Sequence, residues 1–378
     1  MIGTGTGARM SGTNMSGTSK TGTGMTGAAL TDGIAPMAPE RTFMYAEAHE
    51  ASAAVARQLQ ANEPVVRELA AELRKRPPRF IVTCARGSSD HAATFAKYVF
   101  ETQVGLFTAS ASPSVSSVYA ARQDLDGALF VAISQSGKSP DLLQQARAAK
   151  TAGARVVALV NVEDSPLAAM ADVVVPLHAG PERSVAATKS YICSLSAILH
   201  IAASWHGPSE LTDALASAPA ALAQNWARDW SPLVDGLVDA RNLFVIGRGF
   251  GFGAALEAAL KFKETCGLHA EAFSAAEVRH GPMAIVERDF PVLFFAQRDD
   301  TWDGTLALAR EFRDRGARVW VAAPGEGADP LPVGEIAHPA CTPLLTIQNF
   351  YRAANTLSLR RGRNPDVPPH LRKVTETV

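Results

Sequence analysis

The sequence predicts an α/β protein of two tandem units, each a doubly wound parallel sheet with helices on both faces. Two observations support this fold class. Short apolar segments alternate with helical segments, which is the pattern of parallel sheets covered by helices. The pattern then repeats, because residues 80–101 resemble residues 242–264 at an offset of about 162 residues. The chain of 378 residues is long enough for two domains of ordinary size.

The repeat keeps one register over four separate matches. Two of them are glycine-containing pairs, Arg86-Gly87 on Arg248-Gly249 and Gly105-Leu106 on Gly267-Leu268. The other two are apolar segments, ALFVAIS at 128–134 on FPVLFFA at 290–296, and RVVALV at 155–160 within a residue of RVWVAA at 318–323. Four matches in one register predict the internal duplication of a single α/β unit.

Composition narrows the class of protein. Hydrophobic residues make up 47% of the chain and charged residues 19%, which is typical of a globular protein with a large core. The net charge of −1 provides no basic field for nucleic acid or an anionic membrane, and no apolar run reaches the roughly 18 residues of a membrane span. The cysteines form no CxxC pair, so we expect no zinc site or disulfide framework and favour a reducing, cytoplasmic setting.

The first elements follow a low-complexity tract. Residues 1–36 are rich in Gly, Thr, Ser and Met, cannot bury a core, and are predicted to be disordered. Helical periodicity begins in TFMYAEAHEASAAVARQL at 42–59. A further helix is predicted through VVRELAAELRKR at 65–76, ended by Pro77 and Pro78.

The first unit, at 43–205, then alternates strands and helices. A strand, a Gly/Ser turn and a helix are predicted in residues 79–100, and further strands at 107–111, 128–134, 155–162 and 172–177. An Ala-rich helical linker at about 205–240 leads to the second unit at 235–360, and a tail follows at 361–378. Parallel sheets bind ligands at the carboxyl ends of their strands, so the loops there are the candidate site.

One such loop, ISQSGKSPD at 133–141, has the composition of an anion cradle. The first turn of a helix offers unpaired N–H groups, Gly137 permits close approach, and Ser134, Ser136 and Ser139 add hydroxyls. These features favour a phosphate ester. The loop matches neither a Walker motif nor a dinucleotide fingerprint. The alternative is that Ser139 followed by Pro140 only caps the helix.

The same loop carries a family resemblance. SQSG before a helix at the third strand resembles the sugar isomerase (SIS) domain, and two in tandem resemble the isomerase half of glucosamine-6-phosphate synthase and type II glucosamine-6-phosphate deaminases. Three further segments support it: VAATKSY at 185–191, ALEAALKFKETCGLHAEAFSAAEVRHGP at 255–282, and the tail PPHLRKVTETV at 368–378. The resemblance covers roughly residues 43–378.

The resemblance implies which residues hold the substrate. Ser134, Gln135, Ser136 and Ser139 take the place of the family's phosphate-binding loop. Where the family has a Thr-Ser pair after its first strand, this chain has Arg86 and Gly87, so Arg86, Ser88 and Ser89 are the candidate replacements. The implied sugar-binding residues are Val185, Ala187, Glu257 and Lys261. Ala187 stands where the synthase has a serine.

The resemblance also implies three catalytic residues. Glu264 would move a proton between C1 and C2 of the sugar, the step that interconverts an aldose and a ketose. Its alternative is an i,i+3 partner of Lys261 on a solvated helix face. His280 would open the sugar ring from a neighbouring subunit, which implies a homodimer with shared sites. Lys373 would approach the sugar carbonyl or form a Schiff base with it, although a tail lysine is ordinarily a solvated charge.

The expected reaction is therefore glucosamine 6-phosphate plus water giving fructose 6-phosphate and ammonia, with no metal or organic cofactor. The Gly/Thr tract leaves no room for a glutaminase domain in this chain, so we expect no glutamine-driven transfer. Alternatives are a synthase-like isomerase without a glutaminase, a deaminase or deglycase for galactosamine 6-phosphate or a fructosamine phosphate, and a non-enzymatic sugar-phosphate sensor. The second unit has Ala296, Gln297 and Arg298 in its equivalent loop, so we expect no phosphate there.

Overall fold

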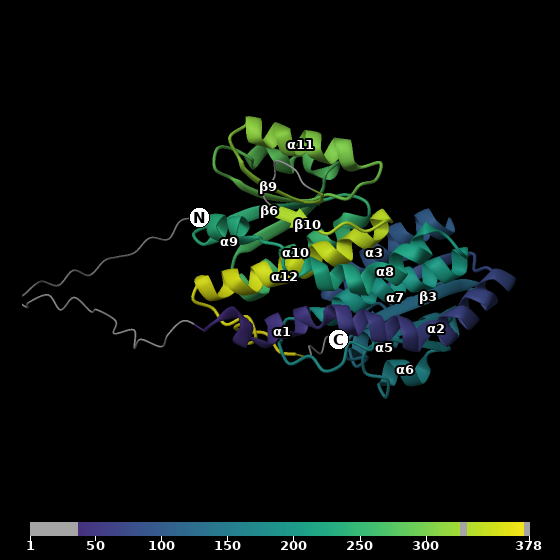
Figure 1. The fold of residues 1–378 in the computed structure, drawn as a ribbon. Coiled ribbons are helices and arrows are strands. Elements are labelled where there is room, and N and C mark those ends of the chain that lie inside the picture. The colour runs from purple at the N-terminus through teal and green to yellow at the C-terminus, as the bar shows by residue number, and fades with distance from the viewer. Residues whose placement is uncertain (1–36, 326–330, 374–378) are drawn as a thin grey trace, which may run out of the picture. The chain divides into compact units, whose positions relative to one another are not determined.

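The computed structural model describes residues 37–325 and 331–373, and it confirms the predicted α/β class. The predicted disorder of residues 1–36 lies outside these residues. The first sheet is parallel and has the order β2 (Thr108–Ser110), β1 (Phe80–Cys84), β3 (Ala128–Ser134), β4 (Arg155–Val160) and β5 (Val173–Pro176) (Figure 1). The second is parallel, with the order β10 (Leu331–Val333), β9 (Arg318–Pro324), β8 (Pro291–Phe295), β6 (Asn242–Gly247) and β7 (His269–Ser274).

The two sheets have the same topology, which confirms the duplication. In each unit the first strand of the sheet lies between the second and the third, and the fourth and fifth follow on the same side. The turn after the first strand is also the same in both units. Gly87 has φ 55° and ψ −131°, and Gly249 has φ 55° and ψ −127°, a left-handed conformation that glycine adopts without strain.

Every residue of β3 is buried, because helices cover both faces of the first sheet. Leu129, Val131 and Ile133 of β3 join the large core shared with the second unit, while Phe130 and Ala132 join a smaller cluster on the opposite face. This is the alternation of side chains along a strand. The helices of this unit are α2 (Ala51–Lys75), α3 (Ser88–Val99), α4 (Ser114–Ser117), α5 (Pro140–Thr151), α6 (Pro166–Met170) and α7 (Lys189–His206).

The N-terminal helices differ from the prediction in where the chain breaks. Helix α1 (Phe43–His49) ends before Glu50, and α2 then runs without interruption through Pro64, whereas two helices at 42–59 and 65–76 were expected. Pro64 lies on the exposed side of α2, where its ring meets solvent rather than the core. A proline in such a position removes one hydrogen bond without ending a helix that packs along its whole length.

The linker and the second unit complete the helical layer. The helices are α8 (Glu210–Asn225), α9 (Ser231–Leu237), α10 (Phe250–Cys266), α11 (Trp302–Asp314) and α12 (Thr342–Arg360). Short turns occur at Pro39–Arg41, Phe100–Val104, Glu277–His280, Pro282–Ile285 and Pro339–Cys341. Helix α10 is central, because it packs on α3 of the first unit as well as on α12 of the second. It therefore brings side chains of the second unit to the first.

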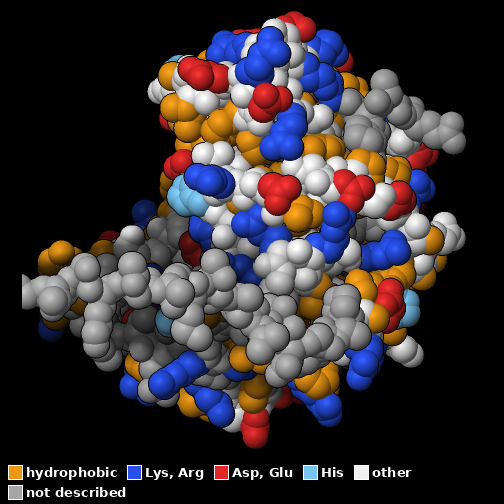
Figure 2. Space-filling model, turned by 90° about the vertical axis from the view of Figure 1, so that its left-hand side faces the viewer, with side chains coloured by type: hydrophobic (Ala, Val, Ile, Leu, Met, Phe, Trp, Pro, Cys, Tyr) orange, Lys and Arg blue, Asp and Glu red, His pale blue; other side chains and the backbone are white. Residues whose placement is uncertain are grey.

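Two further expectations concern the whole of the described chain. Within residues 37–325 and 331–373, no helix is both long and apolar enough to cross a membrane. The four cysteines are buried as free thiols, and burial raises the pKa of Cys84 and Cys193 to about 12. On the face drawn in Figure 2, basic and acidic side chains are interspersed, in keeping with the net charge of −1.

Candidate active site

A pocket of about 350 Å³ opens at the carboxyl end of the first sheet. It brings together most of the residues that the sequence singled out, from five separate segments of the chain. Its lining comprises Arg86, Gly87, Ser88, Ser89, Ile133, Ser134, Gln135, Ser136, Ser139, Leu142, Val185, Ala187, Lys261, Glu264, Arg372 and Lys373. The site is therefore built by both units and by the tail.

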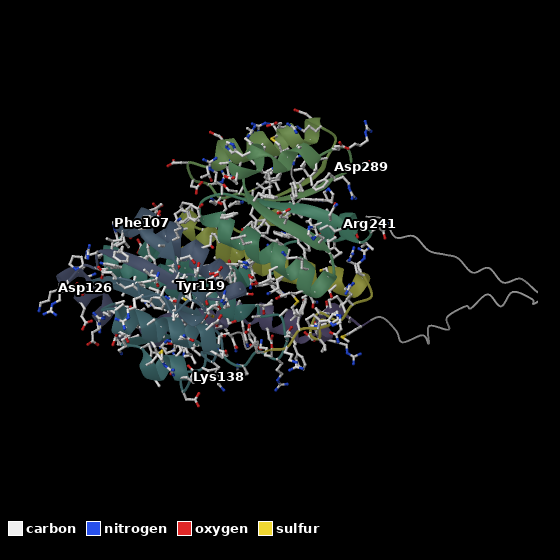
Figure 3. The ribbon with its side chains drawn as sticks, turned by 180° about the vertical axis from the view of Figure 1, so that it is seen from behind. Phe107, Tyr119, Asp126, Lys138, Arg241 and Asp289 are labelled. Carbon is white, nitrogen blue, oxygen red and sulfur yellow. The ribbon has the colours of Figure 1, made fainter. Side chains whose placement is uncertain are left out.

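The loop between β3 and α5 forms one wall. Its backbone is folded on itself, because the Ser134 hydroxyl accepts from Gly137 N at 3.0 Å and the Ser136 hydroxyl from Lys138 N at 3.3 Å. Ser139 is the N-cap of α5, but its side chain makes no capping hydrogen bond. Its hydroxyl thus remains available to a ligand beside the unpaired N–H groups of the helix. Lys138 lies outside the lining, at the edge of the first unit (Figure 3).

Position 137 requires a glycine, because of its backbone conformation and because of the side chains that surround it. Its φ is +63°, and an added Cβ would approach the Ser165 Cβ to 2.6 Å and Val160 Cγ2 to 2.9 Å. We expect Gly137→Ala to weaken phosphate binding at least about tenfold, because the loop must shift to relieve these contacts and the positive φ. The measurement is the rise in melting temperature with inorganic phosphate. Gly304→Ala is the control, since that helical site has an ordinary φ and open space. Equal responses in both variants would show that the loop does not hold phosphate.

Arg86 extends across the mouth of this cradle to a buried carboxylate. Its Nε and Nη2 donate to Asp141 Oδ2 at 2.8 and 2.6 Å, and the Asp141 side chain is 1% exposed while that of Arg86 is 49% exposed. Asp141 lies in the first turn of α5, where its charge would otherwise oppose a phosphate. The ion pair neutralises that charge, and the exposed edge of the guanidinium still faces the pocket.

Helix α10 contributes a buried chain of charges on the opposite wall. Lys261 Nζ contacts Glu257 Oε1 at 3.1 Å and Glu264 Oε2 at 2.7 Å, and it donates to the Ser88 hydroxyl at 2.9 Å. Because Ser88 Oγ accepts this bond, its own proton can be donated to an anion. The side chain of Lys261 is 1% exposed, so the predicted i,i+3 pair is present but does not lie on a solvated face.

Two residues absent from the sequence prediction complete this network. His91 Nδ1 contacts Glu257 Oε2 at 3.0 Å, and the Tyr351 hydroxyl donates to Glu257 Oε1 at 2.9 Å. Burial raises the pKa of Glu257, but Lys261 and His91 outweigh it and hold that pKa below its ordinary value. Burial likewise lowers the pKa of Lys261, and the two carboxylates outweigh it and hold that pKa above its ordinary value.

Lys373 reaches the pocket from the tail. Its Nζ donates to the carbonyl of Ser184 at 2.7 Å and lies 3.6 Å from Glu182 Oε2. Glu182 in turn closes the loop that carries Val185 and Ala187, because it accepts from Thr188 N at 3.0 Å and Ser190 N at 3.1 Å. The tail lysine is therefore held by protein groups and is not a freely solvated charge.

His280 is the one predicted catalytic residue that lies elsewhere. It is exposed, ends a 3-10 turn of the second unit, and is absent from the pocket lining of its own chain. Among the described residues no cluster of three or more His, Cys, Asp or Glu side chains is arranged to hold a metal ion.

The equivalent position of the second unit is occupied by its own side chains. Gln297 Nε2 donates to the Arg248 carbonyl at 2.8 Å and to Asp299 Oδ2 at 2.9 Å, and Thr301 N donates to Asp299 Oδ1 at 2.8 Å. An adjacent pocket of about 650 Å³ includes Asp299 and Asp300 in its lining. Two carboxylates at this position disfavour a phosphate, and the absence of a phosphate site from the second unit remains a prediction.

Fold and site together define a class of protein: two α/β units of the same topology, with a pocket at the carboxyl end of the first sheet that acidic and basic residues of the second unit help to line. The sequence matches the SIS domain over residues 75–204 and 236–331, and the chain belongs to this family.

Individual relatives agree with this assignment. The glutamine–fructose-6-phosphate aminotransferase [isomerizing] of Thermococcus kodakarensis is 32% identical over 88% of this chain and 57% of its own length. The chain thus spans about half the length of such curated relatives. A Silicibacter pomeroyi protein assigned as a phosphosugar isomerase is 42% identical, with a TM-score of 0.81 over 86% of this chain and all of that chain. A glucosamine-6-phosphate deaminase from Thermotoga maritima shares the fold, with a TM-score of 0.71 and 22% identity.

Proposed function

We propose that this protein is a sugar-phosphate isomerase that releases ammonia, converting glucosamine 6-phosphate and water to fructose 6-phosphate and ammonia. The observation that supports it is the position of Glu264. Its side chain is 21% exposed and lines the same pocket as the hydroxyl-rich cradle and Lys373. A carboxylate above an anchored sugar phosphate suits proton transfer between adjacent carbons. The names of the relatives, an aminotransferase and a phosphosugar isomerase, support the substrate class.

The reaction proceeds in three stages. Imidazole of His280 moves the proton of the C1 hydroxyl to the ring oxygen, which opens the sugar. Glu264 takes the proton from C2 and delivers it to C1, while the Lys373 ammonium protonates O1, so the amine at C2 becomes an iminium ion. Water adds to the iminium carbon, the proton that is released returns to Lys373, the C–N bond breaks, and fructose 6-phosphate and ammonia leave. The hydroxyls of Ser134, Ser136 and Ser139, with Ser88, Ser89 and Arg86, hold the phosphate throughout.

A cytoplasmic setting for this protein remains a prediction.

The direct test is to incubate the purified chain with glucosamine 6-phosphate and to measure ammonia and fructose 6-phosphate. Equimolar formation of both supports the proposal. Galactosamine 6-phosphate and a fructosamine phosphate are assayed in parallel. If only one of these turns over, the reaction class stands and the substrate is corrected. If no sugar phosphate reacts or raises the melting temperature, the proposal is wrong.

A synthase-like isomerase is the second candidate, since curated relatives are aminotransferases and this chain covers about half of their length. It would run in the opposite direction, consuming fructose 6-phosphate and free ammonia. Starting the assay from both sides and measuring the rates at equal substrate concentrations separates the two. A rate of glucosamine 6-phosphate formation that exceeds the rate of its breakdown favours the synthase-like role.

We also propose that His280 serves the pocket of a second copy in a homodimer. In that case, mixtures of two inactive variants, Glu264→Gln and His280→Asn, regain activity. Random exchange makes half of the dimers mixed, and each has one intact site, so we expect about a quarter of the wild-type rate. The measurement is ammonia release after co-refolding the two variants, with each variant refolded alone as the control. Mixtures that stay inactive while mixed dimers form would show that His280 serves its own subunit.

A further inference from the structure

Helix α1 is joined by hydrogen bonds to two pocket segments that are far from it in sequence. At its start, the backbone N–H groups of Phe43 and Met44 donate to the two oxygens of Asp366, each at 2.8 Å. At its end, Glu47 Oε1 accepts from the backbone N–H groups of Arg183 and Ser184. Asp366 belongs to the tail that carries Lys373, and Ser184 to the loop that carries Val185.

The tail and this loop are also bonded directly to each other. The N–H of the peptide between Ser184 and Val185 donates to the carbonyl of Asp366 at 3.1 Å. The carbonyl of the same peptide accepts from Lys373 Nζ at 2.7 Å. The tail thus bonds to both the N–H and the carbonyl of one peptide. The contacts that run from α1 through Asp366, this peptide and Glu47 back to α1 form a closed ring. Val185 and Lys373, which both line the pocket, are fixed relative to each other by that ring.

The burial of the two carboxylates indicates a specific role. Glu47 is 5% exposed and Asp366 is 9% exposed, although acidic residues are rarely buried without partners that require them. Glu47 Oε2 is buried and has no hydrogen-bond partner among the residues that the structure describes. The start of α1 is also bonded to α12, because the Thr42 hydroxyl donates to the fully buried Asn355 Oδ1 at 2.7 Å.

We propose that Glu47 and Asp366 are positioning residues, which hold Lys373 and Val185 against the sugar without contacting it. The proposal rests on the proposed function, since it assigns these residues to the sugar end of that site. The proposed phosphate end is formed by the β3–α5 loop and the start of α3, and the hydrogen bonds that form the ring within the described residues involve neither segment. Loosening the ring should therefore lower turnover and leave phosphate binding unchanged.

The test uses Glu47→Gln and Asp366→Asn, which preserve size and remove the charge that strengthens these bonds. We expect kcat to fall about 100-fold, the effect of displacing a reacting group by roughly 1 Å. KM and the stabilisation by inorganic phosphate should stay within about twofold of wild type. Glu68→Gln is the matched control, because Glu68 is an exposed residue of α2, and it should change neither.

Two readouts separate positioning from general damage. In a Lys373→Ala background, Glu47→Gln should cost little further activity, since groups that act through one another are not additive. Hydrogen–deuterium exchange of the 183–187 amides should rise in both variants but not in Glu68→Gln, and this needs no substrate. If exchange rises and wild type does not turn over, the ring stands and the proposed function fails. Unchanged exchange, a parallel loss of phosphate binding, or full additivity with Lys373→Ala would overturn the positioning role.

Discussion

Replacing Glu264 by glutamine is expected to reduce ammonia release from glucosamine 6-phosphate by about 10³-fold, within the range that general acid–base catalysis supplies. The amide retains the shape of the side chain and can still accept the bond from Lys261 Nζ, now 2.7 Å from Glu264 Oε2. It cannot take a proton from C2. The loss should therefore appear in kcat, while KM changes little.

The assay measures ammonia and fructose 6-phosphate together, with the phosphate-induced rise in melting temperature as a check that the cradle is intact. Glu271→Gln is the control, because Glu271 is an exposed carboxylate on β7 of the same unit and is absent from the pocket lining. Loss of C2 deuterium from labelled substrate gives a second readout of the same step. A Glu264→Gln variant that retains full turnover would remove Glu264 from the mechanism.

Glu257→Gln should produce the largest loss of stability. The Glu257 side chain is fully buried and faces Lys261, His91 and the Tyr351 hydroxyl. Removing its charge leaves the buried Lys261 ammonium with Glu264 as its remaining carboxylate. Breaking a buried ion pair from one side costs about 3 to 5 kcal/mol of unfolding free energy. We expect a clear fall in the thermal midpoint and, because Lys261 orients Ser88, weaker phosphate binding as well.

The pH dependence of this difference has a definite sign. The pKa of Glu257 is held below its ordinary value of 4.5, so the folded protein binds this proton less readily than the unfolded chain does. Its contribution to stability is complete above pH 4.5 and is lost as the pH falls through the lower, folded-state pKa. The gap between wild type and Glu257→Gln should thus narrow as the pH falls below 4.5.

A surface ion pair provides the comparison for this prediction. Glu311 contacts Arg279 and Arg315, each at 2.8 Å, but its side chain is 33% exposed. Glu311→Gln should cost less than about 1 kcal/mol, as exposed pairs do. If the two variants lose similar stability, burial of the α10 network contributes nothing beyond ordinary ion pairing.

The parts of the site that follow from local sequence were the parts that could be predicted. The cradle residues lie within one short loop, and Gly137 and the three serines indicate an anion without any knowledge of the tertiary structure. Lys261 and Glu264 lie one turn apart on a helix, so their pairing follows from helical spacing. What the spacing did not indicate is that this helix face is buried against α3, because its depth depends on packing between units.

Groups that act from distant elements carried no local signal. Tyr351 is 94 residues from Glu257, and Asp366 is 323 residues from Phe43. His91 has no candidate partner in its local sequence, because its partner Glu257 lies on the other unit. In hindsight the one usable signal was the internal repeat, which pairs the helix after β1 with the helix after β6 and so suggests that the two pack together.

The contribution of helix α10 to the pocket determines how activity depends on protein concentration. Because Lys261 and Glu264 share one chain with the hydroxyls that they serve, their encounter is intramolecular, and its effective concentration is set by the linker and does not depend on the amount of protein. Diluting the protein cannot separate these groups. A fall in specific activity on dilution would therefore indicate a group supplied by another molecule, so a dilution series tests whether the chemistry needs a second copy of the chain.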